Sequence, residues 1–184
     1  MKVLGINTSP REKSNVRIAL KAALDATASK GAETEIIDIN GLVISPCQGD
    51  NYCKEHDGEC ALNDDMQDIY KKIEEADGII LATPIYFADI NAQAKILIDR
   101  LYSHAMNEKY SEMFSTKKIS IIATSGSPVF DAFEPSLNHK MKIFSLLGFN
   151  TCDMVILGGN NVPGIIAEKE DQLQKAKEVG ENLI

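Results

Sequence analysis

The sequence has few of the residues that several protein classes require. It contains no tryptophan, and only 6% of its residues are aromatic. Basic residues are outnumbered by acidic ones, 19 against 27, which gives a net charge of −8. Because proteins that bind the phosphate backbone normally present a basic face, this balance argues against nucleic acid as a partner. It leaves room for a local basic pocket.

Long apolar runs are also missing from the sequence. No stretch approaches the roughly 20 apolar residues of a membrane-spanning helix, so we expect no membrane partner. Residues 1–6 are too short for a signal peptide and are typical of a strand. We therefore expect a cytoplasmic protein.

Cysteine is sparse but unevenly placed. Four cysteines in 184 residues are too few for a disulfide scaffold. Three of them, Cys47, Cys53 and Cys60, lie in one segment of about 23 residues, 40–62, that is rich in Gly, Pro, Asn and Asp. Structureless connections of this length tend to be functional, and clustered cysteines indicate metal or redox chemistry. We call residues 40–62 the cysteine segment.

Apolar runs and helical patterns alternate along the rest of the chain. The run at 78–83 is continuous, which is typical of a strand buried on both faces of a parallel sheet. Helical spacing of apolar residues indicates helices between the runs. The predicted strands are 3–6, 35–39, 78–83, 119–124 and 152–157, and the predicted helices are 14–30, one that begins at 64–65, one that follows the loop 84–91 and runs to about 104, 132–147 and 168–183.

This alternation predicts an α/β fold. Five strands joined by right-handed crossovers form a doubly wound parallel sheet with helices on both faces. Five strands favour the flavodoxin-like strand order, 2-1-3-4-5, over the dinucleotide-binding order. With 44% hydrophobic residues and no repeat or linker, we expect one domain over residues 1–184, with the cysteine segment as a loop insertion.

Three loops follow strand ends at the edge where such a sheet binds ligands. The first, 8–15, offers the hydroxyls of Ser9 and Ser14 and the guanidinium of Arg11 in front of a helix start. That arrangement is suited to an anion, because helix N-termini present unpaired N–H groups. The second loop, 84–91, adds Tyr86 and Phe87, which can pack against a flat ring. The third is 125–127.

Other phosphate-binding signatures are absent. No G-x-G-x-x-G follows the first strand, and there is no G-x-x-x-x-G-K-[ST], which argues against Rossmann dinucleotide binding and against P-loop chemistry. The first strand ends in Asn7-Thr8-Ser9 and not in the acidic cluster of response regulators. A terminal phosphate in the first loop and a flat ring between the other two fit FMN best.

The motifs of these loops resemble those of a known family. Thr8-Ser9-Pro10-Arg11, followed after two residues by Ser14-Asn15, resembles the G-S-P-R-x-x-[SG]-N phosphate loop of the NAD(P)H-dependent FMN reductase superfamily. The resemblance to its iron–sulfur flavoprotein branch is closer and covers nearly the whole chain. It rests on the cysteine segment followed by 64–66, then on 76–80, 83–87, Lys95, 99–100 and 180–183.

The resemblance implies a flavin site and an oligomer. It implies that the FMN phosphate is held by Ser9, Arg11, Ser14, Asn15 and Val16. It also implies that the isoalloxazine is lined by Pro84, Ile85, Tyr86, Phe87, Ser125 and Gly126. Because family members are dimers or tetramers, we expect a homodimer or a homotetramer.

The cysteine segment departs from the family pattern. The iron–sulfur branch has C-x-x-C-x-x-C and a fourth Cys, whereas here Asp50 occupies the second cysteine position between Cys47 and Cys53, with Cys60 as the last. Four interpretations stay open. They are a [4Fe–4S] cluster with Asp50 as fourth ligand, a loop without metal, a redox-sensitive or disulfide-forming loop, and a zinc site completed by Asp50 or His56.

Two functional hypotheses follow, from different classes. The first is an oxidoreductase in which NAD(P)H passes a hydride to FMN and the electrons go on to a small-molecule or protein acceptor. The flavin would carry that chemistry, so we name no catalytic acid or base. The second is a non-enzymatic electron carrier that accepts electrons from ferredoxin. The acidic surface would suit docking to basic redox partners. A flavin-free metal or redox sensor is a third possibility, and it predicts no bound flavin.

Overall fold

Five apolar segments form the parallel strands of the central sheet. The computed structural model describes residues 1–128 and 131–184. The strands are β1 (Lys2–Asn7), β2 (Glu33–Asp38), β3 (Gly78–Tyr86), β5 (Lys118–Thr124) and β6 (Asn150–Leu157). They lie in the order β2-β1-β3-β5-β6, which is the predicted 2-1-3-4-5 order of the parallel strands. The flavodoxin-like prediction is therefore confirmed.

A sixth strand was not predicted. β4 (Asp89–Ile90) pairs antiparallel with the end of β3, with Ile85 opposite Ile90 and Tyr86 opposite Asp89. The loop expected after the third strand is therefore a hairpin. Its two-residue length explains why no periodic pattern revealed it.

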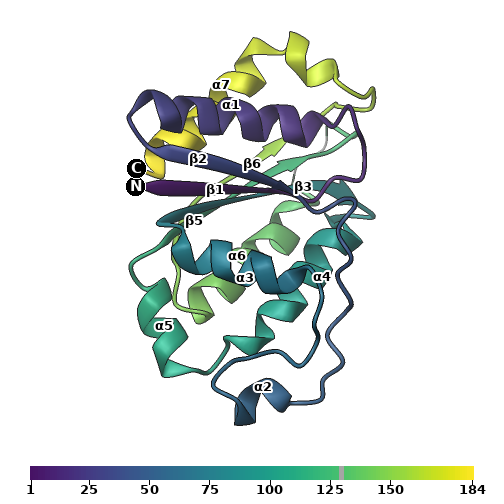
Figure 1. Ribbon diagram of the computed structural model, residues 1–184. Helices are drawn as coiled ribbons and strands as arrows, with labels where there is room; N and C mark the ends of the chain where they lie inside the picture. The colour runs from purple at the N-terminus through teal and green to yellow at the C-terminus, as the bar shows by residue number, and fades with distance from the viewer. Residues whose placement is uncertain (129–130) are drawn as a thin grey trace.

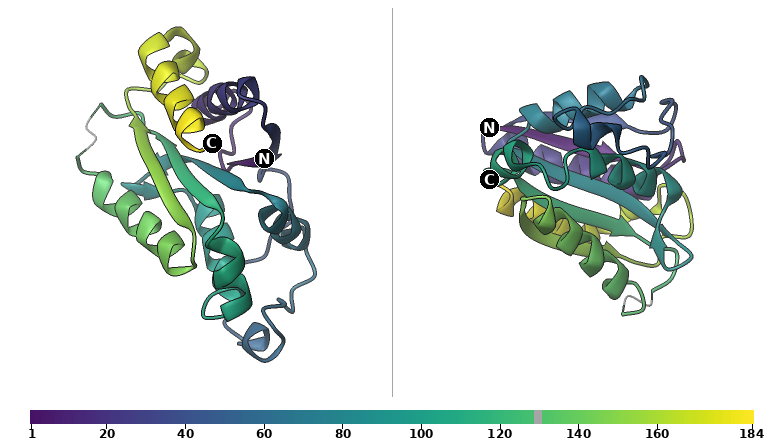
Figure 2. Two further views of the ribbon diagram at one scale, coloured as in Figure 1. Left: turned by 90° about the vertical axis from the view of Figure 1, so that its left-hand side faces the viewer. Right: turned by 90° about the horizontal axis from the view of Figure 1, so that it is seen from below.

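Helices cover both faces of the sheet, as Figures 1 and 2 show. On one face lie α1 (Asn15–Ser29) and α7 (Glu170–Asn182), which pack side by side. On the other lie α3 (Met66–Glu75), α4 (Ala92–Arg100), α5 (Glu108–Phe114) and α6 (Glu134–Leu146). Each face has its own apolar core. Among the described residues, no helix is long and apolar enough to cross a membrane.

Three short helical elements lie outside the predicted pattern. They are α2 (Tyr52–Glu55) in the cysteine segment, α5, and the 3-10 turn η2 (Ile165–Glu168). The helix expected to reach residue 104 ends at Arg100 and continues as a 3-10 turn, η1 (Leu101–Ser103). In α5 only Tyr110 and Phe114 are buried, which is too few apolar positions to define a period.

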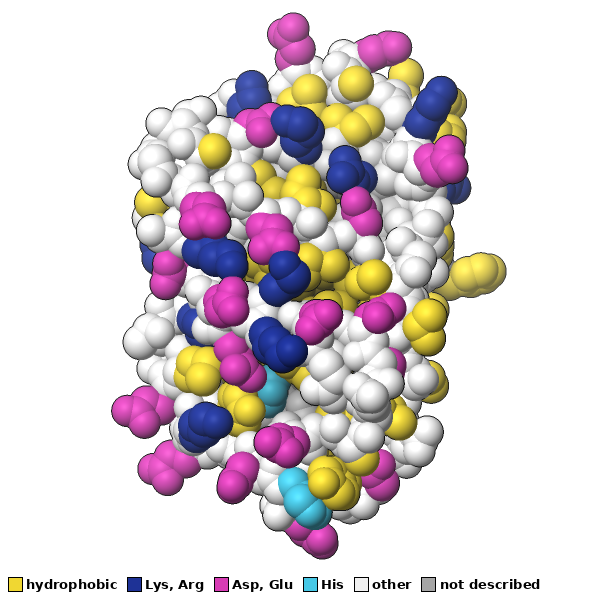
Figure 3. Space-filling view, viewed as in Figure 1, with side chains coloured by type: hydrophobic (Ala, Val, Ile, Leu, Met, Phe, Trp, Pro, Cys, Tyr) yellow, Lys and Arg dark blue, Asp and Glu magenta, His cyan; other side chains and the backbone are white. Residues whose placement is uncertain are grey.

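The face of the molecule in Figure 3 carries acidic and basic side chains interleaved, with no continuous basic patch.

Candidate functional site

The carboxyl ends of β1, β3, β5 and β6 meet around one cleft of about 210 Å³. All the predicted flavin-site residues line it except Val16 and Phe87. Residues that are distant in sequence thus come together at the edge where doubly wound sheets bind ligands. The lining residues are Ser9, Arg11, Ser14, Asn15, Pro84, Ile85, Tyr86, Thr124, Ser125, Gly126, Asn160 and Asn161. From here on we call it the cleft.

One end of the cleft presents hydrogen-bond donors at the start of α1. The Ser14 Oγ caps the helix by accepting the Arg17 N–H at 3.1 Å, so its own proton stays free to donate. The backbone N–H groups of Asn15 and Val16 have no partner within the described part of the chain. With the helix dipole behind them, these donors fit a phosphate.

A hydrogen-bonded chain of side chains positions the first of the phosphate-loop serines. The Ser9 N–H donates to the Asn7 Oδ1 at 3.2 Å, and the Asn7 Nδ2 donates to Asp38 at 2.8 Å. Asp38 also accepts from the Arg17 Nε at 2.8 Å. The hydrogen bond from Arg17 holds the pKa of Asp38 below its usual value, against the effect of burial. Asp38 therefore stays ionised and keeps Asn7 oriented.

Asn15 has a different role from that of the serines. Its Nδ2 donates to the carbonyls of Asn160 at 3.0 Å and Val162 at 2.9 Å, and its Oδ1 accepts the Ile166 N–H at 3.2 Å. An asparagine amide has two N–H donors, and here both are used. Toward an anion Asn15 can therefore offer only its backbone N–H.

Asn91 joins the first two loops of the cleft. Its Oδ1 accepts the Thr8 hydroxyl at 2.9 Å and the Ala94 N–H at 3.1 Å, which caps α4. Its Nδ2 donates to the Thr8 carbonyl at 2.6 Å. Asn91 and Thr8 are both fully buried. Because these bonds are shielded from water, they fix the phosphate loop relative to the end of β3.

The β3–β4 hairpin forms the ring end of the cleft. Phe87 and Ala88, at its turn, have φ values of 49° and 64°, a conformation that costs energy for residues other than glycine. Phe87 is fully exposed, whereas the cleft residue Tyr86 is 38% exposed. These two rings are therefore not packed in the core, which was the alternative to contact with a ligand.

The hairpin is fastened to α6 through Asp89. Its carboxylate pairs with the Lys140 Nζ at 2.9 Å and accepts the Ser136 hydroxyl. Burial opposes ionisation of Asp89, but the hydrogen bonds from Ser136 and Lys140 outweigh it and hold the pKa below its usual value. The strained turn is thus stabilised by a charged contact behind it.

The cysteine segment runs from the end of β2 down to α2, at the bottom of Figure 1, and none of its residues lines the cleft. Cys47 is exposed, Cys53 and Cys60 are half-buried, and all three are free thiols. Burial raises the pKa of the Cys53 thiol. The Asp50 carboxylate accepts the Tyr52 N–H at 3.0 Å at the start of α2. No three His, Cys, Asp or Glu side chains of the described residues are grouped as metal ligands.

This donor set does not fit a four-thiolate cluster. The second cysteine position carries a carboxylate that is already bonded to the backbone of α2. Thiolates are the usual ligands of [4Fe–4S] clusters. The segment therefore offers three thiols and one engaged carboxylate in place of four thiolates.

Two basic side chains tie the cysteine segment to the body of the fold. The Arg100 Nη1 donates to the Ser45 carbonyl at 2.9 Å, near the start of the segment, and to Asp64 at 2.6 Å, just beyond its end. The Lys54 Nζ donates to the carbonyls of Tyr102 and Ala105, both at 2.6 Å. The segment is thus ordered by the protein's own contacts.

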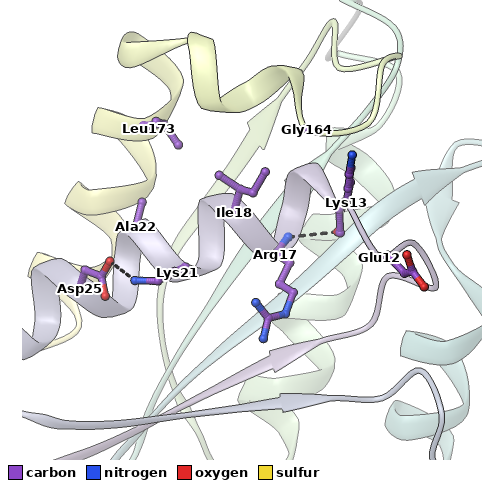
Figure 4. Close-up of a pocket in the computed structure, with 10 residues that line it drawn as sticks. Glu12, Lys13, Arg17, Ile18, Lys21, Ala22, Asp25, Gly164 and Leu173 are labelled. Carbon is purple, nitrogen blue, oxygen red and sulfur yellow. Dashed lines mark hydrogen bonds and ion pairs between the residues drawn. The ribbon is translucent and has the colours of Figure 1, made fainter.

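A larger hollow of about 540 Å³ lies beside α1 (Figure 4). Its basic residues are mostly paired: Arg17 with Asp38, and Lys21 with Asp25 at 2.6 Å. Only Ser14 of the predicted site residues borders it. Without convergent free polar groups, this hollow is a weaker candidate for a ligand site than the cleft.

Sequence reasoning missed three lining residues, Thr124, Asn160 and Asn161. The two asparagines belong to the stretch Gly158-Gly159-Asn160-Asn161, directly after β6. The rule that selected the other loops, a polar turn at the carboxyl end of a parallel strand, applies equally here. That signal was present in the sequence.

Comparisons with known proteins give the same family as the motifs. The profile of the NADPH-dependent FMN reductase family matches residues 1–159. An iron–sulfur flavoprotein of Archaeoglobus fulgidus is 30% identical over 187 residues, which cover 100% of this chain and 79% of that protein. Another, from Methanocaldococcus jannaschii, is 48% identical over 100 residues, 54% of this chain and 51% of the relative.

Solved structures share the fold. An NAD(P)H:quinone oxidoreductase from Methanothermobacter marburgensis superposes with a TM-score of 0.73 at 24% identity, covering 100% of this chain and 99% of that one. Several of the curated iron–sulfur flavoproteins are matched over only about half of their length. The family match nevertheless extends over most of the chain, and the chain belongs to the NADPH-dependent FMN reductase family.

Proposed function

We propose that the chain binds FMN in the cleft and acts as an NAD(P)H-dependent oxidoreductase. The observation that carries the proposal is the polarity of the cleft. Free hydroxyl and N–H donors gather at the α1 end, and Pro84, Ile85 and Tyr86 lie at the other. A ligand with a phosphate at one end and a flat ring at the other matches this arrangement. The family match supports the same ligand.

Each wall of the cleft has a task in this proposal. The hydroxyls of Ser9 and Ser14 and the N–H groups of Asn15 and Val16 bind the phosphate, and Arg11 adds a positive charge. Pro84, Ile85, Tyr86, Ser125 and Gly126 position the ring. When bound, FMN supplies hydride acceptance from NAD(P)H and electron delivery to an acceptor.

The size of the cleft bears on where the ring lies. Pockets for ligands of this kind usually measure roughly 300–1,000 Å³, whereas the cleft measures about 210 Å³. Part of a bound flavin would therefore lie outside it, next to the hairpin that carries the fully exposed Phe87. A nicotinamide could reach the ring from that side.

We propose that residues 1–184 work as one FMN-binding domain.

The partners follow from the same proposal. The electron acceptor is a small molecule or a redox protein, and the chain works as a homodimer or homotetramer. Exposed Phe87, Met106 and Leu146 are apolar surface that a second copy could cover. A cytoplasmic location stays a prediction from composition.

One anaerobic experiment separates the oxidoreductase from the alternatives. Purified, FMN-loaded protein is mixed with NADH or NADPH, and bleaching of the flavin absorbance is followed. We expect bleaching by at least one nucleotide. Bleaching by reduced ferredoxin alone would favour the electron carrier. Failure of the purified chain to take up FMN would favour the flavin-free sensor.

A further inference from the structure

The loop after β6 is a fourth wall of the cleft. Residues 158–169, which include η2, connect β6 to α7, and the match to the family profile ends at residue 159. Asn160 and Asn161 lie just beyond that point and both line the cleft. Neither asparagine belongs to the family motifs found in the other three loops.

The backbone is fixed on both sides of Asn161. The Nδ2 of Asn15 donates to the carbonyls of Asn160 and Val162, the residues immediately before and after it. The Asn160 N–H donates to the Ser125 carbonyl at 2.8 Å. In Figure 4 the chain at Gly164, further along this loop, passes over the start of α1. The position of Asn161 is thus set before any ligand arrives.

The two asparagine side chains of the loop differ in how many of their hydrogen-bonding groups are free. The Asn160 amide is fully used: its Nδ2 donates to Leu157 and Gln172, both at 2.9 Å, and its Oδ1 accepts from Lys169 at 3.0 Å. Asn161 is exposed, and its side chain has no hydrogen-bond partner among residues 1–128 and 131–184. Its carboxamide can therefore donate and accept toward a ligand.

Gly126 provides the space in which this amide lies. A Cβ built on Gly126 would be only 2.1 Å from the Asn161 Oδ1. Any larger residue at position 126 would displace the amide. Because Gly126 has no side chain, the Asn161 amide can lie against the turn that begins at Ser125, another lining residue of the cleft.

We propose that Asn161 is a flavin-contacting residue of the cleft. Its carboxamide donates to and accepts from the polar groups of FMN, the ribityl hydroxyls or the carbonyl and N–H edge of the ring, and Gly126 keeps it in place. The inference rests on the proposed function, because it requires FMN in the cleft.

The test compares FMN dissociation constants of the full chain, stripped of flavin and titrated with FMN. We expect Asn161→Ala to raise the Kd about tenfold, as for the loss of roughly one hydrogen bond. The control is Val162→Ala in the same loop, whose side chain is 59% exposed and does not line the cleft. It should change the Kd by less than about twofold.

A double-mutant cycle tests the pairing with Gly126. Gly126→Ala alone should weaken FMN binding, whereas adding it to Asn161→Ala should have little further effect, because the amide that it displaces is gone. If wild type binds FMN but Asn161→Ala binds equally well, the role of Asn161 is refuted and the proposed function stands. If the two penalties simply add, Gly126 does not act through the Asn161 amide, and the pairing of the two residues is refuted. If wild type does not bind FMN, both proposals are refuted.

Discussion

The cleft and the cysteine segment are both made of loops, but they are held in different ways. The walls of the cleft are joined by buried asparagines, with Asn91 linking the first two loops and Asn15 linking the first to the last. The cysteine segment depends on two cations: Arg100, which reaches it from the end of α4, and Lys54, which reaches out of it to the Tyr102 carbonyl. The links between the cleft loops are neutral and buried, and its ion pairs, Asp38–Arg17 and Asp89–Lys140, lie behind the walls. The cysteine segment is held by the charged groups themselves, so it is more sensitive to the loss of one of them.

The largest expected effect is the loss of the Arg100 anchor. The Arg100 side chain is fully buried and the Asp64 side chain is 8% exposed, so Arg100→Leu would leave a buried carboxylate unpaired. We expect the free energy of unfolding to fall by about 3–5 kcal/mol, measured by urea denaturation. If the variant does not fold, Asp64→Asn tests the same pair. Lys21→Ala, which breaks an exposed pair, should change stability by less than about 0.5 kcal/mol.

The next largest effect is a loss of stability in acid caused by His104, which lies beside the cysteine segment. His104 is buried among Tyr70, Tyr110 and Phe114. Burial, followed by the charges of Lys54 and Lys109, lowers its pKa from 6.5 to about 4, although Glu74 lies 3.8 Å from its Nε2. Between these two values the unfolded state binds more protons than the folded state. The stability therefore falls as the pH drops from 6.5 towards 4.

Urea denaturation between pH 7 and pH 4 measures this loss. The shift of His104 corresponds to about 3 kcal/mol at most, since one pKa unit is about 1.4 kcal/mol. Asp38, Asp64 and Asp89, whose pKa values are also lowered, add further loss below their unfolded values. His104→Phe should flatten the curve between pH 6.5 and pH 4.5. An unchanged slope in that variant would show that His104 is not its source.

On the cleft side, the largest single change is expected from Arg11. Arg11→Ala should weaken FMN binding by about 1.5–3 kcal/mol if a charged hydrogen bond to the phosphate is lost. Fluorescence titration of the flavin measures the dissociation constant. Lys13→Ala is the matched control, because Lys13 is a neighbouring cation that borders the hollow beside α1 and not the cleft. Equal Kd values for wild type and Arg11→Ala would contradict the phosphate assignment.

Features that follow from local sequence patterns could be predicted, whereas features that depend on long-range contacts could not. Strand order and the first three loops follow from periodicity and from the rule for strand ends, and the structure brings their residues together. The engagement of the Asn15 amide by residues 160, 162 and 166 depends on contacts across about 150 positions, which no local pattern encodes. The burial of His104 likewise depends on α5, a helix too short to be recognised from its sequence.

The smallest expected effect tests whether the two regions are independent. Cys53 lies in the cysteine segment and does not line the cleft. We expect Cys53→Ser to change the Kd for FMN by less than about twofold. Iron per chain is measured on the same anaerobic samples, which reports whether Cys53 is a ligand. A large loss of FMN affinity in Cys53→Ser would show that the cysteine segment supports the cleft, and the two regions would then have to be treated as one site.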